Sequence, residues 1–447
     1  MAKHIVIIGA GPAGQEAALK AAKMGASVSL IEQGELGGVC LNCGCVPSKT
    51  WLSSAHAFSN LKELAKYSTK EQELLALSGS FDFAKIQQQR QAVIMRLKKG
   101  LEFLYKSAKI NLIKGQAKIK DNKTILVNNQ EINFDALIIA CGSTAFYPPA
   151  FENFKDKLLD NSKVFNLEKL PNSITILGGG AIGCEFACFF NALGVKVVLV
   201  EKLPQIAQTL GQDISRAITT AFEKRGIEIK TGIGAQGLEI DGAQKTIILE
   251  NGEKIISEEV LVALGRKIDL SNLNLEALNI SYDKKGVKVN AQTMQLKDNI
   301  YGVGDITGMC LLAHAASAQA SAAVNHILTG KSSYDNNLIP SVLYTWPEAA
   351  SIGLTKENAP FAVKAHKSFY LANGRALAQG ESEGFCQILT AEDTGKIVGA
   401  QIVGAQAGEL IHIIALAIKN QMTLEDLSNI TFAHPTLSEI IKDACLK

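Results

Sequence analysis

Three cysteines stand close together in the segment CLNCGC, residues 40 to 45. Cys40 and Cys43 have the C-x-x-C spacing that is typical of half a zinc or iron–sulfur site, and also of a thioredoxin-like redox couple. Cys40 and Cys45 have a C-x-x-x-x-C spacing, which is uncommon for a metal but wide enough for a disulfide across a bend. The spacing alone leaves these three chemistries open, so the surrounding sequence has to distinguish them.

A metal site at this segment would need further ligands. A closed site usually takes four, often as two paired clusters. The other six cysteines offer only Cys184 and Cys188 as a close pair, and their i,i+4 spacing predicts packing within a helix. No second C-x-x-C and no H-x-x-x-H completes a cage. The sequence therefore favours a redox pair and predicts no metal site, with a metal-binding electron-transfer module as the alternative.

The elements that position these cysteines belong to a chain of 447 residues, long enough for about three domains. Hydrophobic residues make up 47% and charged residues 20%, as in ordinary globular proteins. The net charge of +2 gives no reason to expect nucleic acid or a membrane surface as a partner. Nine unevenly spaced cysteines argue against a secreted disulfide scaffold and for a reducing, cytoplasmic compartment. The N-terminus lacks a signal-peptide pattern, and the most apolar later stretch is too short to span a bilayer.

One pattern occurs twice in the chain. HIVIIGAGPAG (4 to 14) and SITILGGGAIG (173 to 183) each join a buried strand to G-x-G-x-x-G and an alanine-rich helix. A second strand follows and ends at Glu32 in the first copy and at Glu201 in the second, in both cases 23 residues after the first glycine. Such glycines let a pyrophosphate approach the helix N-terminus, and the acid accepts hydrogen bonds from a ribose diol. The sequence therefore predicts two dinucleotide-binding sites.

The cysteines and their flanks, GGVCLNCGCVPSK, closely resemble the active-site segment of the flavin-dependent disulfide oxidoreductases. The resemblance covers the whole chain and is greatest to the members that oxidise a dihydrolipoyl group on a carrier protein. Further motifs of the family follow in the family's order, namely ALIIACGS, NIYGVGDIT (299 to 307), YTWPEAASIG (344 to 353), ANGRALA (372 to 378) and AHPTLSE (433 to 439).

The resemblance implies an α/β fold with two Rossmann-like dinucleotide-binding domains, the NAD domain inserted in the FAD domain, and a C-terminal α+β dimerisation domain. GFCQILT and KIVGAQIVG in that last domain are expected to form a hairpin, followed by helices at about 407 to 420 and 436 to 445. The expected domain bounds are 1 to 142 and 268 to 337 for the FAD domain, 143 to 267 for the NAD domain and 338 to 447 for the dimerisation domain.

The resemblance also implies roles for the cysteines and their neighbours. Cys40 and Cys45 are paired as the redox disulfide, with Cys40 as the thiol that exchanges with substrate and Cys45 as the thiol that faces the flavin. Lys49 resembles the lysine beside the flavin, and Glu185 resembles its ion-pair partner. Cys43 stands where the family usually has no sulfur, and we expect it to point away and pack as a small apolar residue.

A base for the thiols is expected near the C-terminus, because exchange needs a thiolate and a free thiol is mostly protonated at neutral pH. His434 and Glu439 resemble the family's dyad, in which the carboxylate orients the ring that takes the proton. A structural role is also open to them, since Pro435 suits a helix start and Thr436-x-x-Glu439 matches a capping box. The family resemblance further implies a homodimer in which His434 acts in trans.

Two cofactors are implied, FAD at the first site and NAD at the second. A 2′-phosphate would meet the carboxylate of Glu201, so the second site is expected to prefer NAD over NADP, although Lys202 could soften that repulsion. Asp305 resembles the acid that binds the ribityl chain of the flavin. The residues assigned to cofactor binding are Gly9, Gly11, Pro12, Ala13, Gly14, Glu32, Gly38, Lys49, Ala117, Gly142, Ser143, Gly178, Gly179, Gly180, Ala181, Ile182, Gly183, Glu201, Ile233, Gly265, Arg266, Gly304, Asp305, Leu312, Ala313 and His314.

The implied activity is oxidation of a protein-bound dihydrolipoyl group by NAD+, in a 2-oxo acid dehydrogenase or glycine cleavage complex. The expected partners are thus a lipoyl-bearing protein and a second copy of the chain, with neither nucleic acid nor membrane. Glutathione reductase is disfavoured by Glu201 and by the sequence VPSK. Mercuric reductase is disfavoured because the C-terminal DACLK has only Cys445 and no vicinal cysteine pair. Both remain alternatives within the family.

Overall fold

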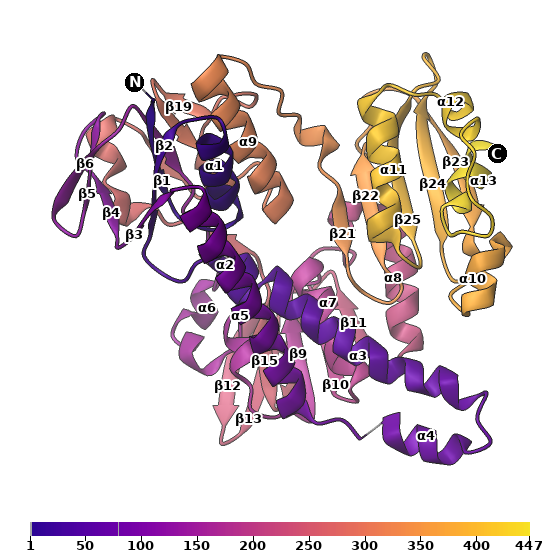
Figure 1. The fold of residues 1–447 in the computed structure, drawn as a ribbon. Helices are drawn as coiled ribbons and strands as arrows, with labels where there is room; N and C mark the ends of the chain where they lie inside the picture. Colours follow the sequence, from indigo (N-terminus) through magenta and orange to yellow (C-terminus); the bar gives the residue numbers. More distant parts are fainter. Residues whose placement is uncertain (1, 79) are drawn as a thin grey trace. The chain divides into compact units, whose positions relative to one another are not determined.

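The computed structural model describes residues 2–78 and 80–447, which form two compact units (Figure 1). Each unit is assembled from three separate stretches of chain. Unit 1 consists of Met1–Thr50, Gln87–Phe146 and Arg266–Asn336, and unit 2 of Trp51–Ile86, Tyr147–Gly265 and Asn337–Lys447. Helix α3 (Cys45–Ala65) begins in unit 1 and ends in unit 2, α4 (Glu71–Ser78) belongs to unit 2, and α5 (Phe83–Ser107) returns the chain to unit 1.

A six-stranded sheet forms the centre of unit 1, in the order β19-β20-β7-β1-β2-β3. All neighbouring strands are parallel except β19 and β20. The residues of β1 from Ile5 to Ile7 are fully buried, as expected of a strand that is covered on both faces. The strands are β1 (His4–Ile8), β2 (Ser27–Glu32), β3 (Asn111–Lys114), β7 (Ala136–Ile139), β19 (Gln295–Lys297) and β20 (Ile300–Gly302).

Two alanine-rich helices of unit 1, α1 (Pro12–Lys23) and α9 (Ala313–Thr329), lie side by side (Figure 1). Their facing positions are small and buried, which lets the two backbones approach closely. A three-stranded antiparallel sheet shares a hydrophobic core with the main sheet. The remaining elements are α2 (Gly38–Cys43), β4 (Ala117–Ile119), β5 (Thr124–Val127), β6 (Gln130–Asn133), and the pairs β8 (Thr144–Ala145) with β16 (Arg266–Lys267) and β17 (Tyr282–Asp283) with β18 (Gly286–Val287).

Unit 2 repeats the strand–loop–helix arrangement in a four-stranded parallel sheet of order β11-β10-β9-β15. A three-stranded antiparallel sheet, β12-β13-β14, covers part of it and shares its core. The elements are β9 (Ser173–Leu177), α7 (Ala181–Ala192), β10 (Lys196–Glu201), α8 (Gln212–Lys224), β11 (Glu228–Thr231), β12 (Ala235–Asp241), β13 (Gln244–Leu249), β14 (Lys254–Ser257), β15 (Glu259–Val262) and the short α6 (Pro149–Glu152).

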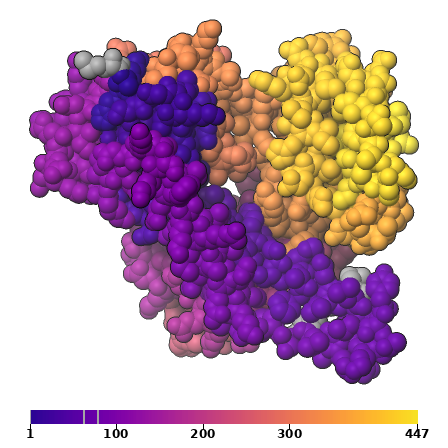
Figure 2. Space-filling view, in the orientation of Figure 1, coloured from indigo at the N-terminus to yellow at the C-terminus, as the bar shows by residue number. Residues whose placement is uncertain are grey.

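The C-terminal part of unit 2 is built on a five-stranded antiparallel sheet of order β21-β22-β25-β24-β23. Two helices, α11 and α13, pack on this sheet and share one hydrophobic core with it. Figure 2 shows this last part of the chain in colours from orange to yellow. The elements are β21 (Ser341–Leu343), β22 (Ala349–Gly353), β23 (Val363–Phe369), α10 (Gly374–Gln379), β24 (Phe385–Ala391), β25 (Ile397–Val403), α11 (Ala407–Lys419), α12 (Leu424–Ser428) and α13 (Glu439–Cys445).

The hairpin predicted in this part is confirmed, because β24 and β25 pair in antiparallel register with Gln387 opposite Gln401. The prediction of a helix from residue 436 was wrong by three residues, since α13 begins at Glu439. The hydroxyl of Thr436 donates to the carbonyl of Ala433 and contacts the hydroxyl of Ser438, so it does not cap the helix. Within the described residues, no helix is long and apolar enough to cross a membrane.

Candidate active site

Cys40 and Cys45 meet at a break between two helices. Helix α2 ends at Cys43, Gly44 bends the chain, and α3 begins at Cys45. A Cβ at Gly44 would lie 2.9 Å from the carbonyl oxygen of Val39 and 3.2 Å from the Cα of Cys40, so only glycine allows this close return. The bend brings the side chain of Cys45 into hydrogen-bond contact with the thiol of Cys40.

Two neighbours act in opposite directions on the Cys40 thiol. Its hydrogen bond to Cys45 and, next, its partial burial raise the pKa of Cys40 well above the ordinary value, while the Lys49 ammonium lowers it. Cys45 is exposed, whereas Cys40 and Cys43 are partly buried. Among the described residues, no group of three or more His, Cys, Asp or Glu side chains could hold a metal ion.

Backbone packing fixes the outer two glycines of each glycine loop. Gly9 and Gly178 have φ values of +102° and +106°. A Cβ on either would lie 2.3 Å from a backbone carbonyl oxygen, that of Ala140 after β7 or that of Ala263 after β15. At Gly14 and Gly183, a Cβ would lie 1.8 Å from the carbonyl oxygen of the first glycine of the same loop. Both loops thus require glycine at these positions whether or not a ligand binds.

The middle glycine of each loop faces open space instead. A Cβ on Gly180 would have no described atom within 4 Å, and one on Gly11 would meet only the Cα of Gly38, at 3.9 Å. Each glycine is the N-cap of its helix, α1 or α7, where unpaired N–H groups and the helix dipole favour an anion. The open approach and the free helix ends fit a dinucleotide pyrophosphate at both loops.

This difference predicts separate effects for two alanine substitutions in the second glycine loop. Gly183→Ala should lower the free energy of unfolding by roughly 1–3 kcal/mol, because its methyl group overlaps a backbone oxygen. Gly180→Ala should leave unfolding nearly unchanged but weaken NADH binding by about tenfold or more, because its methyl group enters the approach to the helix end. Denaturant unfolding and calorimetric titration with NADH measure the two effects. Normal NADH affinity in Gly180→Ala would contradict the assignment of this loop.

The two glutamates are held in the same way in both copies. One oxygen of Glu32 accepts a hydrogen bond from the N–H of Ala10, the residue after the first glycine, at 2.7 Å. The other oxygen accepts from the N–H of Gly34, two residues after the glutamate itself, at 2.6 Å. Glu201 accepts the equivalent pair at 2.6 and 2.7 Å. Two charge-assisted bonds fix each carboxylate beside its loop, in the position that a ribose diol would contact.

Three predicted cofactor residues form one polar cluster in unit 1. The hydroxyl of Ser143 donates to the carboxylate of Asp305, and the Nε of Arg266 donates to the Ser143 hydroxyl at 2.6 Å. The same Nε lies 3.4 Å from Asp305. The short pairing of β8 with β16 places Arg266 beside Ser143, although 123 residues separate them.

The candidate base and its carboxylate are in contact. The Nδ1 of His434 lies 3.0 Å from one oxygen of Glu439, and the other oxygen accepts from the backbone N–H of Thr436 at 2.9 Å. The hydrogen bond from Thr436 and, to a smaller extent, the contact with His434 lower the pKa of Glu439, so its carboxylate is charged at neutral pH. The His434 side chain is 80% exposed, and its Nε2 is the nitrogen left to exchange protons with a substrate. The two residues of the predicted dyad are therefore in contact. The half of the predicted capping box in which Glu439 accepts from the N–H of Thr436 is also formed.

The remaining predicted residues divide between the units. Those assigned to FAD lie in unit 1, where Gly38 contacts Gly11 and the segment Leu312 to His314 starts helix α9. Those assigned to NAD lie in unit 2, apart from Arg266. Four glycines among them, Gly38, Gly142, Gly265 and Gly304, have left-handed backbone conformations, with φ of +57°, +68°, +111° and +76°. Ala117 is buried in β4, and Ile233 is partly buried beside β12.

Lys49 and Glu185 belong to different units. Lys49 lies on α3, one helical turn after Cys45, in unit 1. Glu185 is buried on α7 in unit 2 and accepts a hydrogen bond from the N–H of Tyr344 at 3.3 Å. The ion pair between them stays a prediction.

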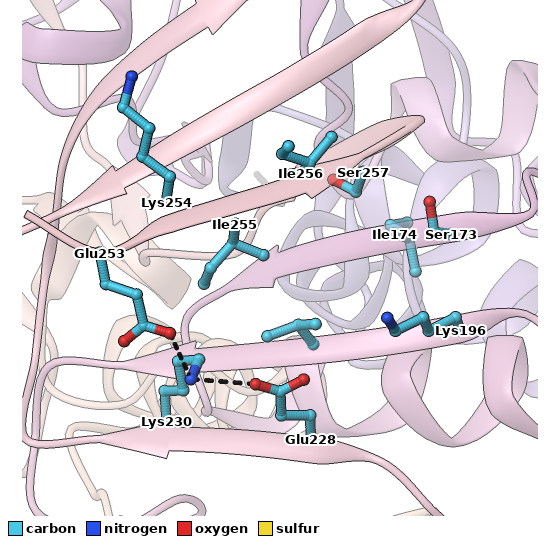
Figure 3. Close-up of a pocket in the computed structure, with 11 residues that line it drawn as sticks. Ser173, Ile174, Lys196, Glu228, Lys230, Glu253, Lys254, Ile255, Ile256 and Ser257 are labelled. Carbon is cyan, nitrogen blue, oxygen red and sulfur yellow. Dashed lines mark ion pairs between the residues drawn. The ribbon is translucent and has the colours of Figure 1, made fainter.

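A polar pocket of about 180 Å³ lies at the amino ends of strands in the four-stranded sheet of unit 2, the end opposite to the glycine loop (Figure 3). It is lined by the first residues of β9, β10 and β11 and by β14. Lys230 in its wall is ion-paired with Glu228 at 3.0 Å and Glu253 at 2.7 Å. Ligands of such sheets bind at the carboxyl ends of the strands, and the pocket contains none of the predicted site residues.

The sequence of the chain matches those of known proteins along nearly its whole length. A model of the pyridine nucleotide-disulphide oxidoreductases matches residues 3–320, and a model of their dimerisation domain matches residues 339–445. The chain belongs to the pyridine nucleotide-disulphide oxidoreductase family. Similar members of the family include the dihydrolipoyl dehydrogenases of Geobacillus stearothermophilus, 36% identical over 98% of this chain and 94% of that protein, and of Chlamydia muridarum, 35% identical over 99% and 96%.

Solved structures of other proteins have the same fold. LpdA from Mycobacterium tuberculosis superposes with a TM-score of 0.92 at 24% identity, over 99% of both chains. The HOCl-induced flavoprotein disulfide reductase RclA from Escherichia coli gives a TM-score of 0.87 at 25% identity, again over 99% of both. The predicted fold class is confirmed by these likenesses and by the two family models.

Membership of the pyridine nucleotide-disulphide oxidoreductase family confirms three further predictions. The chain is an oxidoreductase, and its cofactors are FAD and NAD. Its last hundred residues form a dimerisation domain, which supports a homodimer. The cysteines of the predicted redox pair lie within the part of the chain that the first family model matches.

Proposed function

We propose that this oxidoreductase is a dihydrolipoyl dehydrogenase, which oxidises a protein-bound dihydrolipoyl dithiol with NAD+. The observation that carries the proposal is the contact of Cys40 with Cys45 in a chain that contains both dinucleotide loops. The dihydrolipoyl dehydrogenases that are 35–36% identical to it over nearly its full length give it further support. The substrate is a lipoyl-bearing protein, and the compartment is the cytoplasm.

The chemistry begins with the base. The Nε2 of His434, acting on the cysteines of the other subunit, takes the proton of one substrate thiol. The resulting thiolate attacks the sulfur of Cys40 and breaks the Cys40–Cys45 disulfide, and Cys45 leaves as a thiolate. The second substrate thiol loses its proton and attacks the substrate sulfur bound to Cys40. This step forms the substrate disulfide and releases Cys40, which takes up a proton, so that both electrons now reside on the cysteine pair.

The groups around the pair suit this sequence of steps. The thiol of Cys40 is in hydrogen-bond contact with Cys45, the sulfur proposed to face the flavin. Lys49 supplies a positive charge that lowers the pKa of Cys40 and so favours its thiolate form. Bound FAD would supply the electron acceptor that reoxidises the pair, and bound NAD+ the final hydride acceptor.

The proposal extends to the domains and binding residues. The FAD domain comprises residues 1–142 and 268–337, the NAD domain residues 143–267 and the dimerisation domain residues 338–447. The fixed Glu32 and the first glycine loop would hold FAD, and Asp305 would hold its ribityl chain. Glu201 and the second loop would hold NAD. The open space at each middle glycine supports this assignment.

Substrate competition tests the proposed function. The purified flavoprotein should oxidise dihydrolipoamide with NAD+ and, in reverse, reduce lipoamide with NADH. Oxidised glutathione and mercuric ion, offered under the same conditions, should be reduced at least about a hundredfold more slowly, as for substrates that lack the matching contacts. Faster reduction of either one would transfer the assignment to that substrate. Stoichiometric iron or zinc without flavin would favour the metal-binding alternative.

A further inference from the structure

A second carboxylate, that of Glu250, is bound to the residue that directly follows Glu201. Lys202, which follows β10, forms an ion pair of 2.8 Å with Glu250, which follows β13. The other oxygen of Glu250 accepts a hydrogen bond from the N–H of Gly234 at 3.1 Å. A Cβ on Gly234 would lie 2.8 Å from the Glu250 carboxylate, so the acid rests directly on the backbone there.

The chain segment under Glu250 is itself attached to the segment of Glu201. The N–H of Gly232 donates to the carbonyl of Leu203 at 2.9 Å, and the N–H of Ile233 to the carbonyl of Glu201 at 3.3 Å. Glu250 and Lys202 therefore keep a fixed position relative to the acid that contacts the ribose in such folds. In such folds the acid contacts the 2′-hydroxyl of the ribose, the position at which NADP carries its phosphate, and Lys202 directly follows that acid in the chain.

Lys202 would otherwise favour NADP. It is the first residue after the selective acid, and a free ammonium there would attract a 2′-phosphate and offset the repulsion from Glu201. Glu250 neutralises that charge and draws the side chain towards residue 234. The pKa of Glu250 is lowered, first by Lys202 and then by the N–H of Gly234, so the acid remains charged at neutral pH.

We infer that Glu250 is a specificity-determining residue, which excludes NADP by holding Lys202 away from the 2′ position of the adenosine ribose. The inference rests on the proposed function only in taking the second loop as the NAD site. A purely structural role is the competing explanation, since both side chains are largely exposed and exposed ion pairs contribute little to stability. The pair Lys254–Glu239, also at 2.8 Å and exposed on the same three-stranded sheet, provides the matched comparison.

Binding of nucleotide fragments tests the inference without any dithiol substrate. Calorimetry on the flavin-loaded enzyme would compare adenosine 2′,5′-bisphosphate with 5′-AMP. In Glu250→Gln, the affinity for the bisphosphate divided by the affinity for 5′-AMP should rise by about threefold to fivefold, as expected for release of one exposed ion pair. Glu239→Gln should leave the ratio unchanged. The kcat/KM ratio of NADP+ to NAD+ should shift in the same direction and by a similar factor.

The double variant decides the mechanism. In a Lys202→Gln background, Glu250→Gln should no longer change the ratio, because no lysine is left to release. A shift that persists in that background, or an unchanged ratio in Glu250→Gln alone, would overturn the inference. Absence of dihydrolipoamide oxidation by the wild-type enzyme would instead reject the proposed function and leave the binding comparison intact.

Discussion

Serine in place of Cys45 should reduce dihydrolipoamide oxidation by more than about a thousandfold, as for loss of a covalent catalytic group. The hydroxyl cannot form the disulfide with Cys40, so the enzyme cannot store the two electrons of the substrate. Cys40→Ser should be equally inactive, since no sulfur is then available for attack by the substrate. Steady-state rates with NAD+ measure the loss, and thiol counts before and after reduction by dihydrolipoamide show whether a disulfide existed.

The third cysteine of the segment supplies the control. Cys43→Ser should retain activity within about twofold, in the range of a substitution outside the reacting groups, and should still gain two thiols on reduction. If Cys43→Ser were inactive while Cys45→Ser turned over, the redox pair would be Cys40 with Cys43, and the proposed assignment would be wrong. Peptide mapping of the oxidised wild-type enzyme distinguishes the same two pairings directly.

Glutamine in place of His434 should lower kcat/KM for dihydrolipoamide by about 10²- to 10⁴-fold, the usual contribution of a general base. The ring is fixed by Glu439 through Nδ1, which directs Nε2 outwards to the substrate. Thermal unfolding is the control, because the side chain is 80% exposed and its loss should hardly change stability. A variant that melts early but turns over normally would assign the residue to structure instead.

Glu439→Gln should show how the carboxylate assists. The pKa of Glu439 is lowered by its bonds to Thr436 and His434, so the carboxylate stays ionised at neutral pH and can hold the imidazole ring in place. The maximum rate should fall by about tenfold, as for loss of a group that orients a ligand or base. A maximum rate equal to that of the wild-type enzyme would contradict a role for Glu439 in orienting the base.

The repeated glycine loops could be predicted because they rest on local backbone rules. A tight turn with φ near +100° and a carbonyl 2.3 Å from a missing Cβ require glycine wherever the turn occurs, so the motif appears directly in the sequence. Contacts between distant segments leave no such pattern. Arg266 was assigned by family resemblance, but its hydrogen bonds to Ser143 depend on two strands of only two residues each.

Competition between local contacts limited the prediction elsewhere. Thr436 and Glu439 have the spacing of a capping box, yet the threonine hydroxyl bonds to other partners and only the glutamate half forms. The sequence gives no indication of the role inferred for Glu250. It lies 48 residues after Lys202, and nothing in the sequence distinguishes it from the other acidic residues of the chain as the partner of that lysine. Its hydrogen bond from Gly234 becomes visible only once β12 and β13 are paired.

The interleaved order of the segments has a consequence for protein synthesis. Strand β20 pairs with β7 in the central sheet of unit 1. The ribosome synthesises β20 only after all four strands of the parallel sheet of unit 2, the last of which ends at Val262. Until residue 302 emerges, β7 has an open edge that invites pairing with other nascent chains. The sheet that begins at the N-terminus is therefore completed after the sheet inserted in its middle.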